Sequence, residues 1–412
     1  MACLRIPLEG NRESRDIRIT NPYKGSASIP FELINNLIVL PVRINDSDTL
    51  KFVLDSGAGR TIITELGAEQ SFTIQYTGEA DLRGLGNAGP IPALVSNGNK
   101  LFLNDIEGDN HSVVLLIEST FNLSSFMGTQ VNGLMGYDIF ENFVVEIDYQ
   151  RKKMFFHDPD AFKNEYESLK KSSKWFKIPV DVQDNKLYVQ TEILQSDSTT
   201  VSTRLIVDSG ASHTLFLYPG SSNKITIPKN RVDSYLGSGL AGEIFGSIGR
   251  AYTLTMNELE LGDVVVSYPN SEDIQQALEL DNRNGSLGAD VLRRFTVIFN
   301  YADSTMLLKP NRFIEEDFTY NISGMEIITP ILNLPYYVVG IVRPDSPAEK
   351  AGIKEGDVLY EIDYNRVFKY KLSDIIEIFQ SPDERIRLIV KRGSKLKKIS
   401  LVLEDKTKLT ND

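Results

Sequence analysis

Short runs of apolar residues, separated by clusters of Asn, Asp, Gly and Ser, recur along the first three quarters of the chain. Runs of roughly four to eight residues that are rich in Val, Ile, Leu and Phe are typical of β-strands. We expect strands at residues 37–44, 50–54, 113–117, 144–148, 153–156, 187–194, 204–207, 254–261 and 296–300. The pattern therefore predicts a mainly β protein.

One stretch between these strands has the spacing of an amphipathic helix. Asp158 is a typical N-cap residue, and Pro159 stands at the first helical position, where no N–H group is needed. The apolar spacing continues to about Lys171. We therefore expect a helical linker at residues 158–177, with a group of strands on either side.

An internal repeat divides the strand-rich region into two similar halves. The sequence FVLDSGA at residues 52–58 returns as LIVDSGA at residues 205–211, which is 153 positions later. Further matches follow in the same order: Thr61 with Thr214, residues 84–89 with 237–242, and residues 133–138 with 285–290. Chance alone gives about 0.1 copies of Asp-Ser-Gly in a chain of this length. The repeat predicts two lobes related by a pseudo-twofold axis.

Each copy of the repeat ends an apolar strand with Asp-Ser-Gly-Ala, which places Asp55 and Asp208 at strand-to-turn junctions. The glycine allows a tight turn, and neighbouring hydroxyl and N–H groups can orient the carboxylate oxygens. Across the axis, two carboxylates about 3 Å apart cannot both ionise, so the pair shares one proton. Such a pair can activate a water molecule and polarise a peptide carbonyl without a covalent intermediate.

The aspartate loops, the glycine-rich segments 29 residues after each aspartate, and the Leu-Met-Gly and Ser-Leu-Gly segments further on all belong to the repeat. This set, within residues 30–310, resembles the pepsin and retropepsin clan of aspartic proteases. The resemblance implies that Asp55 and Asp208 are the catalytic pair of an endopeptidase for extended peptide or unfolded polypeptide, without a cofactor. The residues implied to support the pair are Ser56, Gly57, Ser209 and Gly210.

The same resemblance implies that the two glycine-rich loops are flaps that close over a bound peptide. They are Gly84, Leu85 and Gly86 in the first lobe, and Gly237, Ser238 and Gly239 in the second. Two similar flaps resemble a fused retropepsin dimer more than a typical pepsin. The alternative is that both loops are plain hairpin turns.

Three further residues near the repeat could be mistaken for catalytic groups. His213 lies five residues after Asp208, but no Gly-x-Ser-x-Gly motif accompanies it, so we interpret it as a surface turn residue. Asp138 and Asp290 occupy matching positions, and we expect them to cap helices.

From about Phe318 onward the repeat does not recur, and the pattern predicts a separate α+β module. Ser346 and Glu349 form a capping box with Pro347 at the first helical position, and Gly352 ends the short helix. The remaining expected elements are a strand at 358–363, a helix with Ser373 as N-cap, and a hairpin of residues 385–391 and 396–403.

The sequence VRPDSPAEKAGIKEGDV at residues 342–358 resembles bacterial PDZ domains. Such domains bind an extended peptide by strand addition, and backbone N–H groups take up its C-terminal carboxylate. By this resemblance Gly324, Met325, Glu326 and Ile327 form the peptide-binding loop and strand, although Glu326 departs from the apolar or small residues of that loop. The alternative is a structural role, in which the protease lobes cover the groove.

These patterns divide the 412 residues into five segments. We expect an N-terminal tail at 1–29, an aspartic protease lobe at 30–157, the linker at 158–177, a second lobe at 178–312 and the PDZ domain at 318–406. Two rival interpretations stay open. One is a non-catalytic peptide-binding scaffold, similar to a chaperone, and the other pairs each lobe with its copy in a second chain.

Composition narrows the classes of partner. Acidic residues outnumber basic residues by 56 to 44, and the net charge of -12 would repel nucleic acid and anionic membrane surfaces. A single cysteine, Cys3, and three scattered histidines argue against a metal site. The chain contains no apolar run of the about 18 residues that a transmembrane helix requires. The N-terminus also lacks the apolar core of a signal peptide.

Localisation is suggested only by the family resemblance. It implies a cell-envelope or periplasmic protein whose export signal is absent from this numbering, and a cytoplasmic protein is the alternative. One unpaired cysteine is compatible with both compartments.

Overall fold

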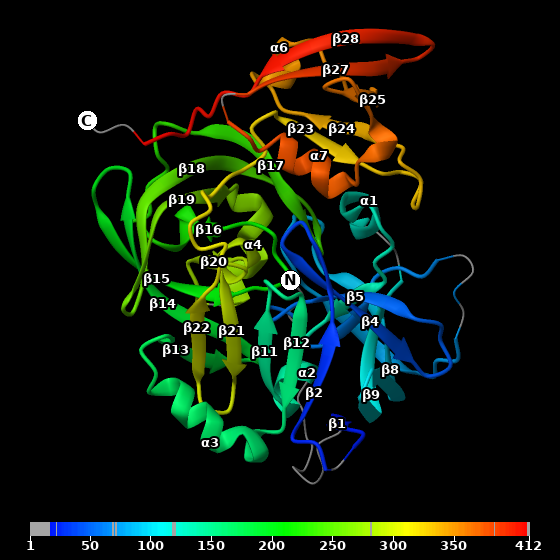
Figure 1. Ribbon diagram of the computed structural model, residues 1–412, viewed down its shortest axis with the longest axis vertical. Helices are drawn as coiled ribbons and strands as arrows, with labels where there is room; N and C mark the ends of the chain where they lie inside the picture. The colour runs from blue at the N-terminus through cyan, green and yellow to red at the C-terminus, as the bar shows by residue number, and fades with distance from the viewer. Residues whose placement is uncertain are drawn as a thin grey trace.

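The computed structural model describes residues 17–21, 23–67, 70, 72–117, 121–280, 282–382 and 384–409. Cys3 and more than half of the expected N-terminal tail lie outside this part of the chain. Figure 1 shows a first half in blue and cyan, a second half in green, and a third body at the top in orange and red. The fold is mainly β, as the sequence predicts.

The first half is a curled sheet in the order β1-β9-β6-β10-β5-β4-β8-β7, with β3 paired to β4. Its strands are β1 (Ile17–Ile19), β3 (Glu32–Ile34), β4 (Leu37–Ile44), β5 (Leu50–Leu54), β6 (Thr61–Ile63), β7 (Tyr76–Leu82), β8 (Ile91–Leu103), β9 (Ile106–Leu116) and β10 (Gly133–Met135). A further pairing of β9 with β8 closes six of these strands into a barrel. Leu40, Phe52 and Leu54 are fully buried in its core.

The second half repeats this plan strand for strand. Its strands are β14 (Lys186–Gln195), β15 (Thr200–Val207), β16 (Leu215–Leu217), β17 (Val232–Gly239), β18 (Gly242–Met256), β19 (Leu259–Pro269) and β20 (Gly285–Leu287). The order β19-β16-β20-β15-β14-β18 corresponds to β9-β6-β10-β5-β4-β8, and β18 again closes the ring. The predicted pseudo-twofold repeat is therefore confirmed in the fold.

The two halves share one sheet, which the sequence did not reveal. It runs β2 (Ser26–Pro30), β12 (Lys153–His157), β11 (Val144–Asp148), β21 (Phe295–Asn300), β22 (Thr305–Pro310) and β13 (Phe176–Gln183). The central pair β11–β21 joins the halves through backbone hydrogen bonds. Helix α3 (Pro159–Lys170) packs Phe162 and Tyr166 against this sheet, so the expected linker helix is also part of the joint (Figure 1).

The third body is a small sheet with the order β23-β24-β25-β27-β28. Its elements are β23 (Met325–Ile328), β24 (Val338–Val342), α6 (Pro347–Lys350), β25 (Val358–Ile362), β26 (Asn365–Arg366), α7 (Leu372–Ile378), β27 (Arg385–Arg392) and β28 (Lys395–Val402). Ser346 caps α6 as expected, by accepting a hydrogen bond from Glu349 N. The expected C-terminal hairpin is confirmed in β27 and β28.

Two expected elements are wrong in detail. Residues 254–261 are not one strand, because Asn257 has a positive φ of 52° and the chain turns there from β18 into β19. Ser373 lies inside α7, and the helix begins one residue earlier with Lys371 as its N-cap. The sequence analysis also missed the helices α1 (Leu123–Met127) and α4 (Ser271–Leu280), and it implied α2 (Tyr137–Asn142) and α5 (Ala289–Leu292) only through the caps expected at Asp138 and Asp290.

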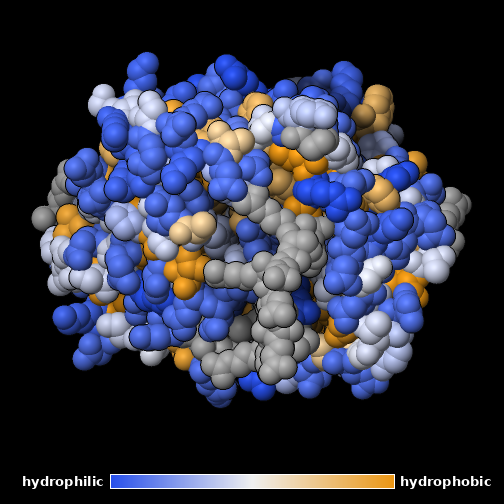
Figure 2. All heavy atoms as spheres, turned by 90° about the horizontal axis from the view of Figure 1, so that it is seen from below, coloured by the Kyte–Doolittle hydropathy of each residue, from blue (hydrophilic) through white to orange (hydrophobic). Residues whose placement is uncertain are grey.

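The surface seen from below in Figure 2 is mostly hydrophilic, with small and separate hydrophobic patches. Within the described residues, no helix combines the length and the apolar character that a membrane span requires.

Candidate active site

Asp55 and Asp208 follow directly after β5 and β15, at equivalent places in the two barrels. Strand β10 lies parallel to β5 and antiparallel to β6, and β20 makes the same contacts with β15 and β16. Both inserted strands begin with glycine. A Cβ on Gly133 would lie 2.0 Å from a backbone oxygen of β6, and one on Gly285 would lie 1.8 Å from a backbone oxygen of β16. The repeated glycines therefore allow the close packing that fixes both aspartate loops.

The two carboxylates lie together within a single chain. An atom at the Cβ position of Gly57 would be 3.1 Å from Asp55 Oδ1 and 3.3 Å from Asp208 Oδ1. An atom at the same position of Gly210 would be 2.8 Å from Asp55 Oδ1. Only 3% of Asp55 and 1% of Asp208 is exposed. A second copy of the chain is not needed to bring these two acids together.

Backbone N–H groups orient each carboxylate in the same way. Gly57 N donates to Asp55 Oδ1 at 2.8 Å, and Gly210 N donates to Asp208 Oδ1 at 3.0 Å. A side chain on Gly210 would collide with the opposite acid, because its Cβ would lie 2.4 Å from Asp55 Cγ. Glycine at this position lets the two loops approach each other.

Ser56 and Ser209 form a brace across the two lobes. Ser56 Oγ donates to the carbonyl oxygen of Val207 at 2.8 Å, and Ser209 Oγ donates to that of Leu54 at 2.9 Å. Each hydroxyl oxygen also accepts a hydrogen bond from the backbone N of the other serine, at 3.0 Å. A hydroxyl can donate and accept at once, so two small side chains satisfy four buried backbone groups.

The surroundings of Asp208 favour its protonated form. Burial and the neighbouring Asp55 carboxylate raise the pKa of Asp208 far above its ordinary range, against the opposing charge of Arg283. Its Oδ2 atom is buried and has no hydrogen-bond partner among the described residues. A carboxyl group with a raised pKa keeps its proton near neutral pH. The pair can therefore hold one proton, with an unengaged Asp208 oxygen available for a further contact.

Two long hairpins, β7–β8 and β17–β18, carry the expected flap loops, and their tips meet. Ala241 N donates to Leu85 O and Ala88 N donates to Ala241 O, both at 2.9 Å. A Cβ on Gly86 would lie 2.3 Å from Ala241 C, and one on Gly239 would lie 2.2 Å from Leu85 O. The tips therefore touch backbone to backbone.

The other expected flap residues do not contribute to this contact between backbones in the same way. Gly84 lies in the loop between β7 and β8. Gly237 has a positive φ of 135° and open space at its Cβ position, and Ser238 pairs with Glu243 inside the second hairpin.

Each tip inserts apolar side chains into the opposite half. Leu85 belongs to a cluster with Phe216, Tyr218 and Ile244 of the second half. Leu240 and Ala241 belong to a cluster that includes Leu82 and Ile91 of the first half. Leu85 is 4% exposed and Leu240 is fully buried, so neither tip is a solvent-exposed turn.

His213 lies in the bend between β15 and β16, as the expected turn residue does, but it is half-buried rather than fully exposed. Its ring stacks on Phe216 with centroids 3.7 Å apart, and its Nε2 lies 2.9 Å from Ser286 Oγ. Burial lowers the pKa of His213 to about 3, so the imidazole is neutral. It packs in the second half rather than acting as a base.

Asp138 and Asp290 do not cap helices, because Gly136 and Gly288 occupy the N-cap positions of α2 and α5. Asp138 Oδ2 instead accepts hydrogen bonds from the N and Oγ1 of Thr61, at 2.6 and 2.9 Å. Asp290 Oδ2 accepts one from Thr214 Oγ1 at 2.7 Å. Each acid thereby ties the segment after an aspartate loop to the helix that contains the acid, α2 or α5.

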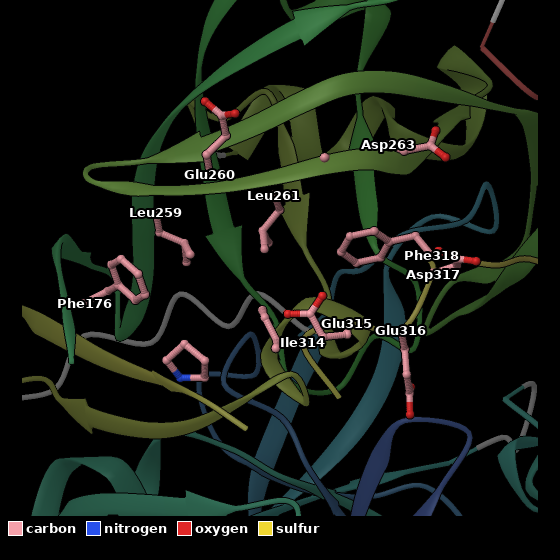
Figure 3. A pocket seen from close by; sticks show the side chains of 12 residues that line it. Phe176, Leu259, Glu260, Leu261, Asp263, Ile314, Glu315, Glu316, Asp317 and Phe318 are labelled. Carbon is pink, nitrogen blue, oxygen red and sulfur yellow. The ribbon is translucent and has the colours of Figure 1, made fainter. Parts of the chain in front are cut away.

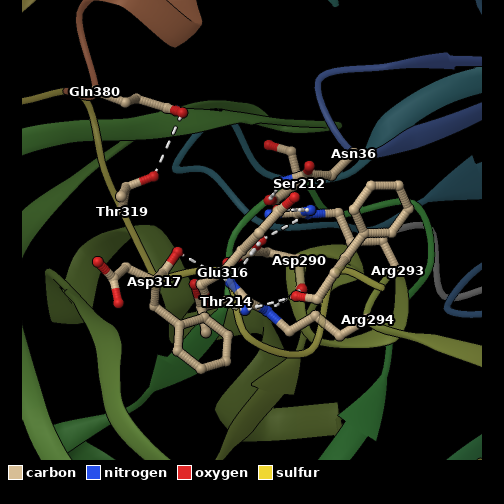
Figure 4. A network of polar contacts seen from close by, with 12 residues as sticks. Asn36, Ser212, Thr214, Asp290, Arg293, Arg294, Glu316, Asp317, Thr319 and Gln380 are labelled. Carbon is tan, nitrogen blue, oxygen red and sulfur yellow. Dashed lines mark hydrogen bonds and ion pairs between the residues drawn. The ribbon is translucent and has the colours of Figure 1, made fainter. Parts of the chain in front are cut away.

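In the second half, a buried arginine extends this network (Figure 4). Arg294 is fully buried, donates to the carbonyl oxygens of Phe313, Glu316 and Asp317, and stacks on Phe318. It therefore anchors the segment that leads from the second half to the third body.

One contribution to the brace has no motif in the sequence. The Tyr301 hydroxyl lies 3.5 Å from Ser56 O, and its ring packs on Tyr137 and Phe140. In the sequence, Tyr301 could be noticed only because it matches Tyr149 in the repeat. In the structure, both tyrosines belong to the same hydrophobic core.

The expected PDZ residues lie together in the third body. Gly324 has a positive φ of 75°, and a Cβ there would lie 2.2 Å from Ser346 Cβ. Met325 and Ile327 are buried in the core of this body. Glu326 accepts a hydrogen bond from Asn321 Nδ2 at 3.1 Å, and burial raises the pKa of Glu326 to about 7.

A hollow of about 440 Å³ opens beside β19, at a place different from the aspartate loops. Leu261 and Ile314 point into it, whereas Glu260 points away (Figure 3). Across the described part of the chain, no cluster of three or more His, Cys, Asp or Glu side chains could hold a metal ion. The hollow therefore offers no chemistry comparable to that of the aspartate pair.

Comparison with known proteins identifies two domains. Residues 40–139 match the family model for aspartyl proteases, and residues 338–392 match the family model for PDZ domains. Among curated proteins, none matches the chain.

Two solved structures resemble the fold at low identity. The aspartic proteinase from Irpex lacteus aligns with a TM-score of 0.44 and 12% identity, over 71% of this chain and 99% of its own. Basic 7S globulin from soybean aligns with a TM-score of 0.41 and 8% identity, over 71% of this chain and 97% of its own.

The chain thus combines an aspartyl protease-like domain with a PDZ domain. These two domains support a function of the protease type and suggest that the chain binds peptides as substrate or ligand.

The brace gives a first testable prediction. Replacing Ser209 with alanine leaves Leu54 O and Ser56 N buried without partners, which should lower the free energy of unfolding by about 3 kcal/mol. Ser209→Thr keeps the hydroxyl and should lose less than about 1 kcal/mol. Urea denaturation of the two variants measures this difference. Equal losses would show that the hydroxyl bonds do not hold the lobes together.

The raised pKa of Asp208 gives a second prediction, on stability against pH. The folded chain keeps a proton that an unfolded aspartate, with a pKa of about 3.9, has released. Stability should therefore fall as the pH rises from about 4 towards the folded pKa. Asp208→Asn should remove this slope and raise the melting temperature at pH 7. The exposed Asp48→Asn is the control, and an unchanged slope in Asp208→Asn would contradict the assignment.

Proposed function

We propose that this chain is an aspartic endopeptidase, in which Asp55 and Asp208 hydrolyse peptide bonds with an activated water molecule. The observation that carries the proposal is the meeting of two buried Asp-Ser-Gly loops from separate halves, locked by the Ser56–Ser209 brace. If the two acids served only the stability of the fold, neutral or apolar residues at these positions would stabilise the folded chain more. Burying two carboxyl groups beside each other is explained by the chemistry that they can perform.

The proposed mechanism assigns different roles to the two acids. Asp55, ionised, takes a proton from a water molecule held between the carboxyl groups. The water oxygen forms a bond to the scissile carbonyl carbon, while protonated Asp208 donates to the carbonyl oxygen. The diol breaks its C–N bond as the proton taken up by Asp55 passes to the leaving nitrogen, and Asp208 takes back a proton from a diol hydroxyl, which leaves a carboxylic acid as product and restores the starting pair. This assignment is supported by the raised pKa of Asp208 and by its unengaged Oδ2 atom.

The proposed substrate is an extended peptide or an unfolded polypeptide. The two hairpin tips, with Gly84–Gly86 and Gly237–Gly239 as flaps, would have to separate to admit a chain and would then close over it. For this function we propose lobes at residues 30–157 and 178–312, joined by residues 158–177, with the PDZ domain at 318–406.

The dyad assignment is tested by changing one acid at a time. Asp55→Asn and Asp208→Asn should each lower kcat/KM on an unfolded protein substrate by at least about 10³-fold, because each removes a proton transfer or charge that the pair supplies. Asp48→Asn, an exposed change in the same lobe, should retain full activity. Cleavage is measured by mass spectrometry of the released peptides.

Two results would contradict the proposal. Substantial cleavage by either asparagine variant would reject the dyad. No cleavage by the unmodified chain, together with tight binding of the same substrate, would instead favour the peptide-binding scaffold.

The flap assignment is tested at Gly86. A Cβ there would lie 2.3 Å from Ala241 C, so Gly86→Ala should prevent the two tips from closing over a bound peptide and lower kcat/KM by about tenfold or more. Gly237→Ala is a matched control, because it has a similar positive φ but no atom near its Cβ. Equal effects of the two changes would show that backbone strain, and not contact between the tips, controls the reaction.

A further inference from the structure

Helix α1 of the first half lies at a three-way contact. Ser125 O accepts a hydrogen bond from Thr329 N, at the end of β23 in the PDZ domain, at 3.0 Å. The ring of Phe126 stacks on Tyr235 of the second flap hairpin, with centroids 5.9 Å apart. Gly128, which ends the helix with a φ of 68°, leaves only 2.9 Å between its Cβ position and Leu372 Cβ of α7. Helix α1 therefore touches the PDZ strand, the PDZ helix and the flap.

These contacts fall on the groove where a PDZ domain adds a peptide strand. Among the described strands, β23 pairs only with β24, so its other edge faces α7 and α1. Gly324 O accepts from Arg343 N on the β24 side, which directs the backbone groups of Met325, Ile327 and Thr329 to the free edge. Both ends of that edge are already engaged, because Met325 O accepts from an asparagine side chain and Thr329 N donates to α1.

The groove is also poorly suited to a C-terminal carboxylate. Glu326 is the second residue of β23, next to the loop where the ligand carboxylate would be received, and its own carboxyl group accepts a hydrogen bond from Asn321. Two carboxylates in one site repel each other. A ligand without a terminal charge, such as an internal segment of an unfolded polypeptide, avoids this repulsion.

The PDZ domain and its C-terminal extension hold the second flap hairpin directly. Arg343 Nη1 lies 3.4 Å from Ser234 Oγ on β17. Arg250 on β18 donates to Asp405 Oδ2 at 3.0 Å, and both side chains of this ion pair are buried. Asn230 Nδ2, just before β17, donates to Lys408 O at 3.1 Å. The first flap hairpin, within the described residues, has no such set of bonds to the third body.

We propose that the PDZ domain is a clamp on the second flap, with its groove closed by α1. An extended, internal peptide segment that adds to β23 takes the place of α1, loosens the Phe126–Tyr235 contact and lets the β17–β18 hairpin lift from the aspartates. The predicted change in peptidase activity rests on the proposed function. The predicted opening of the β17–β18 hairpin does not depend on it.

The test uses the full chain with the change Gly128→Ala. The added methyl group pushes against Leu372, and alanine also carries the strain of a positive φ. Gly352→Ala is the matched control, since it has a φ of 81° in the PDZ domain and open space around its Cβ position. Hydrogen exchange, followed by mass spectrometry, reports opening of β23 and of β17. A fluorogenic unfolded substrate reports kcat/KM.

We expect Gly128→Ala to raise exchange in both β23 and β17 by about tenfold and to raise kcat/KM several-fold, with Gly352→Ala unchanged in both. A second variant, Phe126→Ala, should raise exchange in β17 but not in β23. If Gly128→Ala opens β23 while β17 and kcat/KM stay unchanged, the clamp is rejected. If the unmodified chain has no peptidase activity, the proposed function fails. The clamp is then tested only by whether Gly128→Ala raises hydrogen exchange in β17.

A peptide probe tests the occupant of the groove. The segment FNLSSFMGTQ of residues 121–130, acetylated and amidated, should compete with α1 and raise exchange in β17 of Asp55→Asn, which cannot cleave it under the proposed mechanism. The same peptide with a free C-terminal carboxylate should bind no better. Preference for the free acid, or binding without a change in β17, would overturn the proposal.

Discussion

Four buried hydrogen bonds between the Ser56 and Ser209 loops hold together everything that this molecule is proposed to do. Two carboxyl groups in a buried site repel each other unless one of them is protonated, so they do not attract the halves towards each other. Neutral groups next to the acids provide that attraction, through hydroxyls that donate and accept at once. Burial, together with the nearby Asp55 carboxylate, then raises the pKa of Asp208 and makes a shared proton possible.

The two halves follow one plan but have unequal partners. The barrels, the glycine-led inserted strands and the threonine–aspartate ties recur almost unchanged. Arg294 anchors the segment that leads from the second half to the third body, and the PDZ domain with its C-terminal extension bonds to the second flap hairpin, whereas the first half meets the PDZ domain through α1. Duplication therefore supplied symmetry at the acids, and the added domain changed the environment of one flap hairpin.

Much of this could be predicted from sequence because the information was local or repeated. Asp55, Ser56 and their copies carry a short motif, and the Asp158–Pro159 signal marks the start of α3 correctly. The shared sheet could not be found, because no local pattern reveals that β11 pairs with a strand about 150 residues away. The contacts of the half-buried His213 with Phe216 and Ser286 could not be found for a similar reason, because they arise only from tertiary packing. The contact of Ala241 with Leu85 likewise depends on two hairpins meeting.

The sheet common to both halves also limits what can reach the acids. Its central ladder, from Val145–Phe299 to Asp148–Thr296, ties the barrels along their base, so they cannot swing apart without breaking backbone bonds. The proposed flaps would therefore separate at the hairpin tips, while the shared sheet keeps the two barrels at a fixed distance from each other. Under the proposed function, an opening between the tips would take up an extended polypeptide, so a substrate protein would have to unfold before it reaches the acids.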